Sequence, residues 1–279
     1  MSLRYYWVYY RCGCTSPDTD DLGTVSASCP KHGDAIWRTY GDTASQAALD
    51  KVLLVTFPKA GKHMLKQMLE GSPYRLHPAF TFCKVGEIEW WGEWRPKAEI
   101  LDRLSRVRPG FFMSTHAIYE PWLAKYLTTN GWKVIVLTRD LRDVVVSMGH
   151  FVKHHAGWGE ALGLETPYEI MRAVLIGHPP DVPPIRQRWG AFEPWLRCPG
   201  ILHVRYERCI QDVGAEATRV AKYLGLSAGH ASRMVKSVNG PKKGGVYFRA
   251  GRVGDWRAEF DDELLRLAKR EFQGLAYRW

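Results

Sequence analysis

Short apolar runs alternate with amphipathic stretches along most of this chain. Runs typical of buried strands cover residues 51–57, 111–115, 133–138 and 201–205. Apolar positions spaced by three and four predict helices at 62–70, 119–128, 140–153, 167–176, 184–196, 213–225 and 261–272. Strands that alternate with helices are typical of an α/β domain whose central sheet is mainly parallel and covered on both faces. In such a sheet we expect ligands outside the carboxyl ends of the strands, where Lys59, His116 and Arg139 fall.

The turn after the first of these strands has the composition of an anion site. The apolar run at 51–57 ends in a short Pro/Gly turn at 58–61, and a helical pattern follows. A strand that turns into a helix directs backbone N–H groups and the positive end of the helix at one point. Lys59 and Lys62 add full charges there, so we expect the turn to bind a phosphate or sulfate. It is not a Walker A loop, because His63 stands where that loop needs a magnesium-binding hydroxyl.

Two later segments offer further groups for binding phosphate. Residues 133–147 again run from a strand into a helix and contain Arg139 and Ser147. Residues 248–257 combine Arg249 with two glycines. Arginine presents a planar, bidentate fork to phosphate, whereas serine and glycine allow close approach. Both segments therefore contain residue types that suit a phosphate, and their role follows from the resemblance described next.

Together these segments resemble the motifs of the PAPS-dependent sulfotransferases, in the order that the family has them. Residues 56–64 are similar to the family's 5′-phosphosulfate loop, residues 139–147 to its 3′-phosphate motif, and residues 249–257 to its Arg-x-Gly-x-x-Gly-Asp-Trp-Lys loop. The resemblance covers residues 48–279. It implies a P-loop-like three-layer fold, PAPS as the sulfuryl donor and PAP as the product.

The resemblance also implies roles for individual residues. His116, in a Thr-His pair, would take the proton of the acceptor hydroxyl, and an imidazole that titrates near neutrality suits that work. Lys59 would stabilise the leaving phosphate during an in-line displacement. The acceptor is expected to be a small molecule with a hydroxyl group, and no catalytic metal is needed. The nucleotide would be bound by Lys59, Ala60, Gly61, Lys62, His63, Met64, Arg139, Ser147, Tyr206, Arg249, Ala250 and Gly251.

The chain departs from the family pattern in ways that leave alternatives open. Lys62-His63-Met64 replaces Thr-Thr-Trp, which removes two hydroxyls and the tryptophan that stacks on adenine, and Ser114 replaces a lysine that often precedes the Thr-His pair. One alternative is an ATP- or GTP-using phosphotransferase, although such an enzyme needs a Walker A loop and a magnesium-holding carboxylate. Another is a zinc-ribbon scaffold protein with a vestigial PAPS site.

The first 46 residues are expected to form a separate zinc-binding segment ahead of a sulfotransferase domain at 47–279. Cys12, Cys14, Cys29 and His32 make a Cys₃His set that could close a tetrahedron around zinc in a zinc-ribbon-like unit. The Cys-x-Cys spacing departs from the usual Cys-x₂-Cys. A closed site of four ligands would be structural; the alternative is a flexible leader with free cysteines.

The charge and the hydropathy of the chain limit the kinds of binding partner that we expect. The net charge of +10 divides into −2 over residues 1–50 and +12 over the remainder, and a basic body suits an anionic ligand. Basic residues are not clustered on one element with interleaved aromatics, so we expect no nucleic-acid partner. No run approaches the roughly eighteen apolar residues that span a bilayer. We therefore expect a cytoplasmic protein without a membrane span, and a homodimer is left open.

Overall fold

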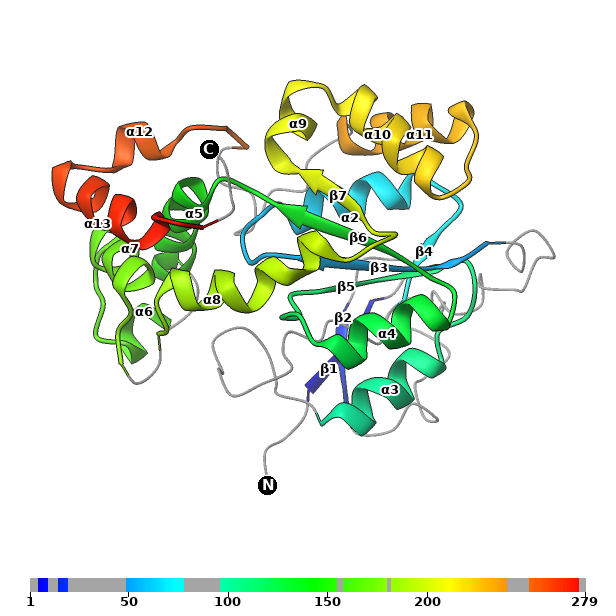
Figure 1. Ribbon diagram of the computed structural model, residues 1–279, viewed down its shortest axis with the longest axis horizontal. Helices are drawn as coiled ribbons and strands as arrows, with labels where there is room; N and C mark the ends of the chain where they lie inside the picture. Colours follow the sequence, from blue (N-terminus) through cyan, green and yellow to red (C-terminus); the bar gives the residue numbers. More distant parts are fainter. Residues whose placement is uncertain are drawn as a thin grey trace.

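A parallel five-stranded sheet forms the centre of the protein, with the strand order β4-β5-β3-β6-β7 (Figure 1). The computed structural model describes residues 5–9, 15–19, 49–77, 96–154, 158–179, 182–239 and 251–275. The strands of this sheet are β3 (Lys51–Thr56), β4 (Arg75–Leu76), β5 (Phe111–Thr115), β6 (Trp132–Thr138) and β7 (Leu202–Arg205). Valine, isoleucine and leucine fill the interiors of β3 and β6 and are almost fully buried. Such continuous apolar strands are typical of a parallel sheet that is covered on both faces.

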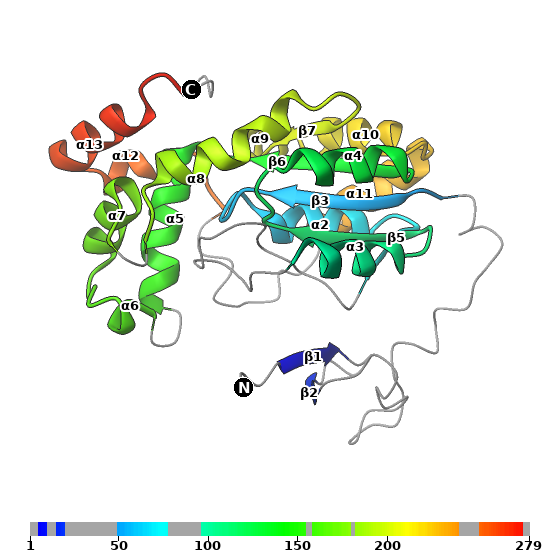
Figure 2. The ribbon, with the colours of Figure 1, turned by 60° about the horizontal axis from the view of Figure 1, so that its bottom comes forward.

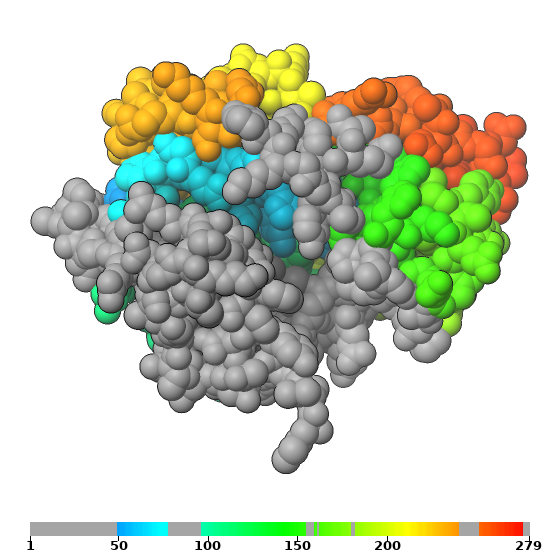
Figure 3. Space-filling model, turned by 180° about the vertical axis from the view of Figure 1, so that it is seen from behind, coloured from blue at the N-terminus to red at the C-terminus, as the bar shows by residue number. Residues whose placement is uncertain are grey.

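Helices lie on both faces of this sheet. The helices of the described chain are α2 (Lys62–Glu70), α3 (Lys97–Ser105), α4 (Pro121–Thr129), α5 (Leu141–His154), α6 (Trp158–Ala161), α7 (Pro167–Ile176), α8 (Ile185–Phe192), α9 (Tyr206–Gln211), α10 (Val213–Tyr223), α11 (Ala228–Asn239), α12 (Trp256–Glu259) and α13 (Asp262–Phe272), with a 3₁₀-helix η2 at Glu193–Arg197. The helices α4 and α8 cover the face seen in Figure 1, and α2 and α11 cover the opposite face, seen in Figure 3. The predicted α/β fold with a parallel sheet is confirmed.

The register of the sheet brings three strand ends to one edge. β3 pairs in parallel with β5, with Val55 opposite Thr115, and with β6, with Thr56 opposite Leu137. Because parallel strands point the same way, the segments that follow β3, β5 and β6 leave the sheet side by side. These are the segments that contain Lys59, His116 and Arg139, as the pattern of the sequence predicts.

A group of helices closes the space beyond this edge. The helices α5, α7, α12 and α13 lie together at the end of the molecule where the strands finish (Figures 1 and 2). Their ends are well defined: Thr166 and Glu169 form a capping box at the start of α7, and Asp261 caps α13 through the N–H of Leu264. Such caps fix where each helix begins. The helices therefore form a wall next to the strand ends.

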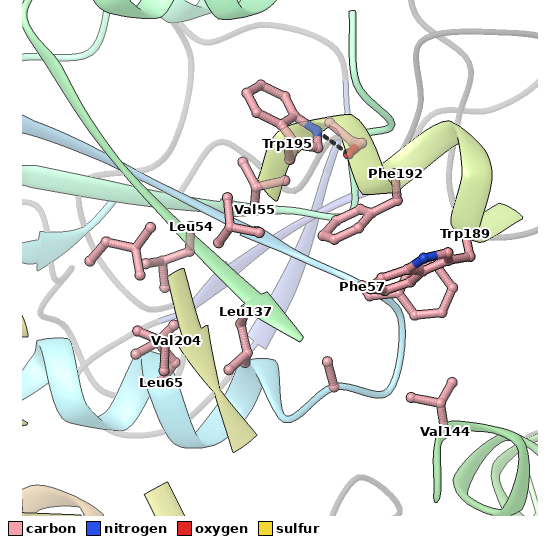
Figure 4. Packing of buried hydrophobic residues seen from close by; sticks show 14 of the residues in the cluster. Leu54, Val55, Phe57, Leu65, Leu137, Val144, Trp189, Phe192, Trp195 and Val204 are labelled. Carbon is pink, nitrogen blue, oxygen red and sulfur yellow. Dashed lines mark hydrogen bonds between the residues drawn. The ribbon is translucent and has the colours of Figure 1, made fainter. Parts of the chain in front are cut away.

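The hydrophobic core is continuous from the sheet into the helices. Leu54 and Val55 of β3, Leu137 of β6, Val204 of β7 and Leu65 of α2 are all fully buried in it (Figure 4). The core thus ties the first strand-to-helix unit to the strands on either side. It holds the turn between β3 and α2 in place at both ends.

The elements differ from the predicted ones at a few positions. The helix predicted at 184–196 is divided into α8 and η2, because Pro194 cannot donate the backbone hydrogen bond that a continuous helix needs. The apolar pattern does not predict α3, α9 or α11. In α11 only Ala231 and Met234 are buried, so its apolar stripe is too narrow to stand out in the sequence.

The N-terminal segment shows a feature that the zinc prediction did not include. β1 (Tyr5–Tyr9) and β2 (Thr15–Thr19) form an antiparallel pair. The predicted zinc ligands Cys12, Cys14, Cys29 and His32 lie outside the described residues. The residues that are described contain no group of histidine, cysteine and acidic side chains that could hold a metal ion. Because the four predicted ligands lie outside these residues, the structure gives no support to the zinc site. Across the same residues, no helix has the length and apolarity to cross a membrane.

Gly71 offers a test of how closely α2 packs on α11, two helices that lie in contact on the face seen in Figure 3. A Cβ at this position would lie 2.6 Å from the carbonyl oxygen of Arg233 and 2.8 Å from the Cα of Met234. Both are backbone atoms, so the helices would have to move apart. We expect Gly71→Ala to lower the free energy of unfolding by about 1–3 kcal/mol in urea denaturation.

Gly190→Ala is the matched control, because a Cβ on this exposed residue of α8 meets nothing within 4 Å. Alanine favours helix over glycine, so this variant should gain about 0.5–1 kcal/mol. Equal stability of Gly71→Ala and the wild type would contradict the close approach of α2 and α11.

Candidate active site

The turn between β3 and α2 has an unusual backbone. Lys59 has φ 63°, and no other non-glycine residue of the described chain has a positive φ. Gly61 follows with φ 102° as the N-cap of α2, and no side chain caps this helix. Left-handed backbone at a residue other than glycine costs about 1–2 kcal/mol and is found mainly at functional sites. The local chain therefore favours a ligand at the N-terminus of α2.

Tyr206 connects this turn to the end of β6. A Cβ at Gly61 would lie 2.6 Å from Cδ2 of Tyr206, so only glycine lets the ring come this close. The guanidinium carbon of Arg139 lies 4.4 Å from the centre of the same ring. Tyr206 is 6% exposed. Its ring thus packs against both loops that were predicted to bind phosphates.

One hydrogen-bond donor of Arg139 has no acceptor in the described part of the chain. Its side chain is buried, Nη2 donates to the carbonyl oxygen of Arg252 at 2.8 Å, and Nη2 lies 3.7 Å from Oδ2 of Asp143. Nε is buried and has no partner among the described residues. Leaving a buried donor unpaired costs about 1–3 kcal/mol. A ligand with an acceptor oxygen would remove this cost.

Asp143 attaches the C-terminal segment to the site. Its carboxylate accepts hydrogen bonds from the N–H groups of Gly254, at 2.8 Å, and Trp256, at 3.2 Å. The guanidinium of Arg142 pairs with Asp140 and lies 4.0 Å above the ring of Trp256. The segment from residue 251 onward is therefore held beside Arg139, although more than 100 residues separate the two in sequence.

The other predicted site residues are partly within and partly outside the described residues. Gly251 has φ 65°, whereas Arg249 and Ala250 lie outside the described residues. Ser147 lies on α5, is half-buried, and its hydroxyl has no hydrogen bond to another described residue. His63 is exposed on α2, and Met64 packs against the hydrophobic core.

The surroundings of Lys59 disfavour its protonated, charged form. Its Nζ lies 3.6 Å from the centre of the Phe151 ring. Burial, together with the positive charges of Arg139 and Lys62, lowers the pKa of Lys59 to about 7. An anion in contact with these three groups would restore the full charge of Lys59.

His116 is held in one tautomer. Its Nδ1 lies 2.8 Å from the carbonyl oxygen of Thr56 and 3.0 Å from the hydroxyl of Thr56, which itself donates to the carbonyl of Thr115. Because a carbonyl oxygen can only accept, Nδ1 carries the proton. Nε2 therefore bears the lone pair, and no hydrogen bond to a described residue occupies it.

The surroundings of His116 also keep it neutral. Burial and then the charges of Lys62, Arg188 and Lys59 lower its pKa well below 6.5, against a smaller opposing effect of the hydrogen bond to Thr56. A neutral imidazole with an open Nε2 can act as a base at neutral pH. Half-buried, it retains an accessible edge for a substrate.

Arg188 belongs to this site and was missed in the sequence. It lies on α8, its guanidinium carbon is 5.9 Å from the centre of the Phe57 ring, and its charge acts on His116. No motif surrounds it in the sequence, where it is one of several arginines in a helical pattern. A position near His116 follows only from the packing of α8.

Comparison with known families agrees with this geometry. The profile of the sulfotransferase domain family matches residues 49–279. The chain belongs to this family. Among related sulfotransferases, sulfotransferase 6B1 of Danio rerio is 24% identical over 242 residues, which cover 78% of this chain and 75% of the relative. Human sulfotransferase 2B1 is 24% identical over 269 residues, which cover 82% of this chain and 65% of the relative.

Two solved structures share the fold. The mouse sulfotransferase SULT7A1 complexed with PAP has a TM-score of 0.61 at 19% identity, over 84% of this chain and 88% of that chain. Retinol dehydratase in complex with androsterone and inactive cofactor PAP has a TM-score of 0.53 at 16% identity, over 82% of each chain. At these identities the likeness concerns the fold.

The state of His116 in this sulfotransferase can be measured directly. We expect its imidazole to remain neutral, with the proton on Nδ1, from pH 8 down to below 6.5, because the pKa of the folded protein is lowered. Long-range ¹⁵N–¹H correlation spectra report both the charge and the tautomer. The resonances are assigned by their loss in His116→Asn, and a titration at pH 6.5 or a proton on Nε2 would contradict the geometry.

Proposed function

We propose that this sulfotransferase transfers a sulfuryl group from PAPS to a hydroxyl group of a small-molecule acceptor. The observation that supports this most strongly is the convergence of Lys59, Lys62 and Arg139 at the N-terminus of α2, where the pKa of Lys59 falls to about 7. Cations are brought together at such a cost where a polyanion binds. Membership of the family supports the class of reaction.

The residues present fit the donor. Lys59, Ala60, Gly61 and Lys62 would hold the phosphosulfate at the start of α2, where backbone and side-chain charges favour an anion. On the other side of Tyr206, the unpaired buried Nε of Arg139 fits an oxygen of the 3′-phosphate. Ser147, Arg249, Ala250 and Gly251 are proposed as further contacts of this phosphate on the strength of the motifs. Two structures with the same fold contain PAP.

The chemical step needs a base and a stabilised leaving group. The acceptor hydroxyl would give its proton to Nε2 of His116 while its oxygen forms a bond to sulfur. The bond from sulfur to the bridging oxygen breaks, and its electron pair stays on the phosphate of PAP. Lys59 and Lys62 would stabilise the charge that develops there. His116 would thus act on the acceptor oxygen, and Lys59 and Lys62 on the bridging oxygen at the other side of the sulfur.

The departures from the family motif replace hydroxyl and indole groups at the donor site, and the site remains positively charged. Lys62 begins α2 and adds a cation where the family has a hydroxyl, and Met64 packs partly in the core, where it can still line the edge of a base. A phosphotransferase is less favoured, because the family match is to sulfotransferases. The zinc site at Cys12, Cys14, Cys29 and His32, a homodimer and a cytoplasmic location remain predictions from the sequence.

Titration of the protein with PAP tests the donor site. We expect Arg139→Gln to weaken PAP binding by about ten- to a hundredfold in isothermal calorimetry, because it removes a charge-assisted hydrogen bond to a buried phosphate. Binding of ATP without magnesium should be weaker than that of PAP in the wild type. Arg172→Gln is the control, because Arg172 is an exposed residue of α7 whose guanidinium pairs with Glu263 of α13.

Equal binding of PAP and ATP would remove the donor assignment. A folded Arg139→Gln variant with wild-type affinity for PAP would do the same for the role of Arg139. Thermal unfolding identifies a variant that has lost its fold, since Asp143 loses a partner in Arg139→Gln.

The low pKa of Lys59 predicts a proton linkage. In the free protein Lys59 is about half protonated at pH 7, and a bound polyanion raises its pKa. Binding of PAP at pH 8 should therefore take up close to one proton, and affinity should fall as the pH rises above 7. Calorimetry in buffers of different ionisation enthalpy measures this uptake. In Lys59→Arg the uptake should vanish, because arginine stays protonated; an uptake that persists in this variant would assign it to another group.

A further inference from the structure

Lys59 occupies the turn after β3 at a conformational cost. The N–H of Ala60 donates to the carbonyl oxygen of Phe57 at 3.0 Å, which closes a β-turn with Pro58 in the second position and Lys59 in the third. The φ of 63° at Lys59 lies in the positive range that a type II turn needs in its third position, where glycine is usual. A glycine would relieve the strain but would also remove the ammonium. The turn therefore keeps a side chain where the backbone alone favours none.

The ammonium of Lys59 lies against an aromatic ring of α5. Its Nζ is 3.6 Å from the centre of the Phe151 ring, and Phe151 is 6% exposed. A lysine that only covers apolar surface packs its methylene stem there and keeps its charged end in water. Here the charged atom itself lies over the ring, which is the arrangement of a cation–π contact. The ring therefore holds the charge of Lys59 as well as its stem.

Phe151 is itself held in place by the packing of α5, which lies beside α7 (Figure 2). A Cβ at Gly149 would lie 2.7 Å from Cγ of Met171 and 2.8 Å from the carbonyl oxygen of Pro167, so glycine lets the two helices come close. Such close packing leaves α5 little freedom to shift. The ring that meets Lys59 is thus part of a fixed wall.

The same helix contacts a second cation of the donor site. Asp143, near the start of α5, has its carboxylate 3.7 Å from Nη2 of Arg139. Phe151 follows about two turns later on this helix and contacts Lys59. One rigid element therefore reaches the cations of two different loops, one through a carboxylate and the other through an aromatic ring.

Positive charge faces Lys59 from several elements. Burial and then the charges of Arg139, after β6, and Lys62, on α2, lower the pKa of Lys59 to about 7. The charge of Lys59 acts in turn on His63 of α2 and on His116 after β5. The pKa values of both histidines are lowered, so neither adds charge at neutral pH.

The ring of Phe151 acts against these effects. The face of an aromatic ring carries partial negative charge, which attracts a protonated amine far more strongly than a neutral one. The contact therefore favours the charged form of Lys59, the form that can stabilise a leaving phosphate. An aliphatic side chain could fill the same space but would not supply this attraction.

We propose that Phe151 is a positioning residue of the donor site, whose ring face holds the ammonium of Lys59 in place and in its charged form. The inference rests on the proposed function, in which Lys59 acts on the bridging oxygen that leaves with PAP. Phe151 takes no part in the bonds that form and break, and it takes up no proton. Its effect reaches the reaction through Lys59.

Titration of Lys59 in the free protein tests the contact without any ligand. With ¹³C-labelled lysine, the Cε resonance of Lys59 is assigned by its loss in Lys59→Arg, and its chemical shift reports the charge of the amine. We expect Phe151→Leu to lower the pKa of Lys59 by about one pH unit from the wild-type value of about 7, because a cation–π contact away from water is lost. Phe151→Tyr keeps a ring face and should retain most of the wild-type pKa.

Phe272→Leu is the matched control. Phe272 lies on α13 and, like Phe151, is 6% exposed. The substitution therefore removes a comparable amount of buried aromatic surface and leaves the ring over Lys59 in place. We expect the pKa of Lys59 to be unchanged in this variant.

The affinity for PAP at different pH values gives the functional readout. Affinity should fall as the pH rises above the pKa of Lys59 in the free protein, so in Phe151→Leu the fall should begin at a lower pH. We expect the ratio of the affinities at pH 6 and pH 8 to be about fivefold larger in Phe151→Leu than in the wild type. A defect of packing alone would weaken binding by the same factor at every pH.

The outcomes separate this inference from the proposed function. An unchanged pKa of Lys59 in folded Phe151→Leu overturns the inference, even if this variant binds PAP less tightly. A wild-type protein that does not bind PAP contradicts the proposed function, and the role of Phe151 in transfer then fails with it, although a lowered pKa would still establish the contact. Circular dichroism reports folding. Should Phe151→Leu fail to fold, Phe151→Met is titrated instead and judged by the same criterion.

Discussion

Repulsion between buried cations is the constraint on which the site depends. The fold gathers Lys59, Lys62 and Arg139 at one edge of the sheet, and the resulting loss of solvation and mutual repulsion bring the pKa of Lys59 to about 7. The carboxylate of Asp143 lies 3.7 Å from Nη2 of Arg139. It already accepts hydrogen bonds from two backbone N–H groups. The positive charge gathered at this edge therefore favours a bound anion.

The remainder of the fold holds these groups against that repulsion. Parallel pairing of β3 with β5 and β6 fixes where each loop begins, and the buried core extends into α2. Tyr206 fills the space between Gly61 and Arg139. The carboxylate of Asp143 accepts backbone hydrogen bonds from Gly254 and from Trp256, the first residue of α12, and so holds the C-terminal segment at the site. These contacts hold Lys59, Lys62 and Arg139 close to one another despite their like charges.

The base is prepared by the same surroundings. The carbonyl of Thr56, at the end of β3, accepts a hydrogen bond from Nδ1 of His116 and so leaves the lone pair on Nε2. Burial, and then the cations that favour an anion, lower the pKa of this imidazole and keep it neutral. One distribution of charge therefore serves both donor binding and proton transfer. α8 adds Arg188 to it from a third element, through aromatic packing on Phe57.

The sequence by itself determined the fold class and the three loops of the site. Lys59, His116 and Arg139 each follow an apolar run, and parallel topology alone places such residues at one edge. Tertiary structure decided which further groups join them. Asp143 meets Gly254, Tyr206 meets Gly61 and Arg188 approaches His116 across large separations in the chain. No local periodicity encodes such contacts, because they depend on how whole helices pack. The tautomer of His116 was likewise decided by a carbonyl that comes from a neighbouring strand.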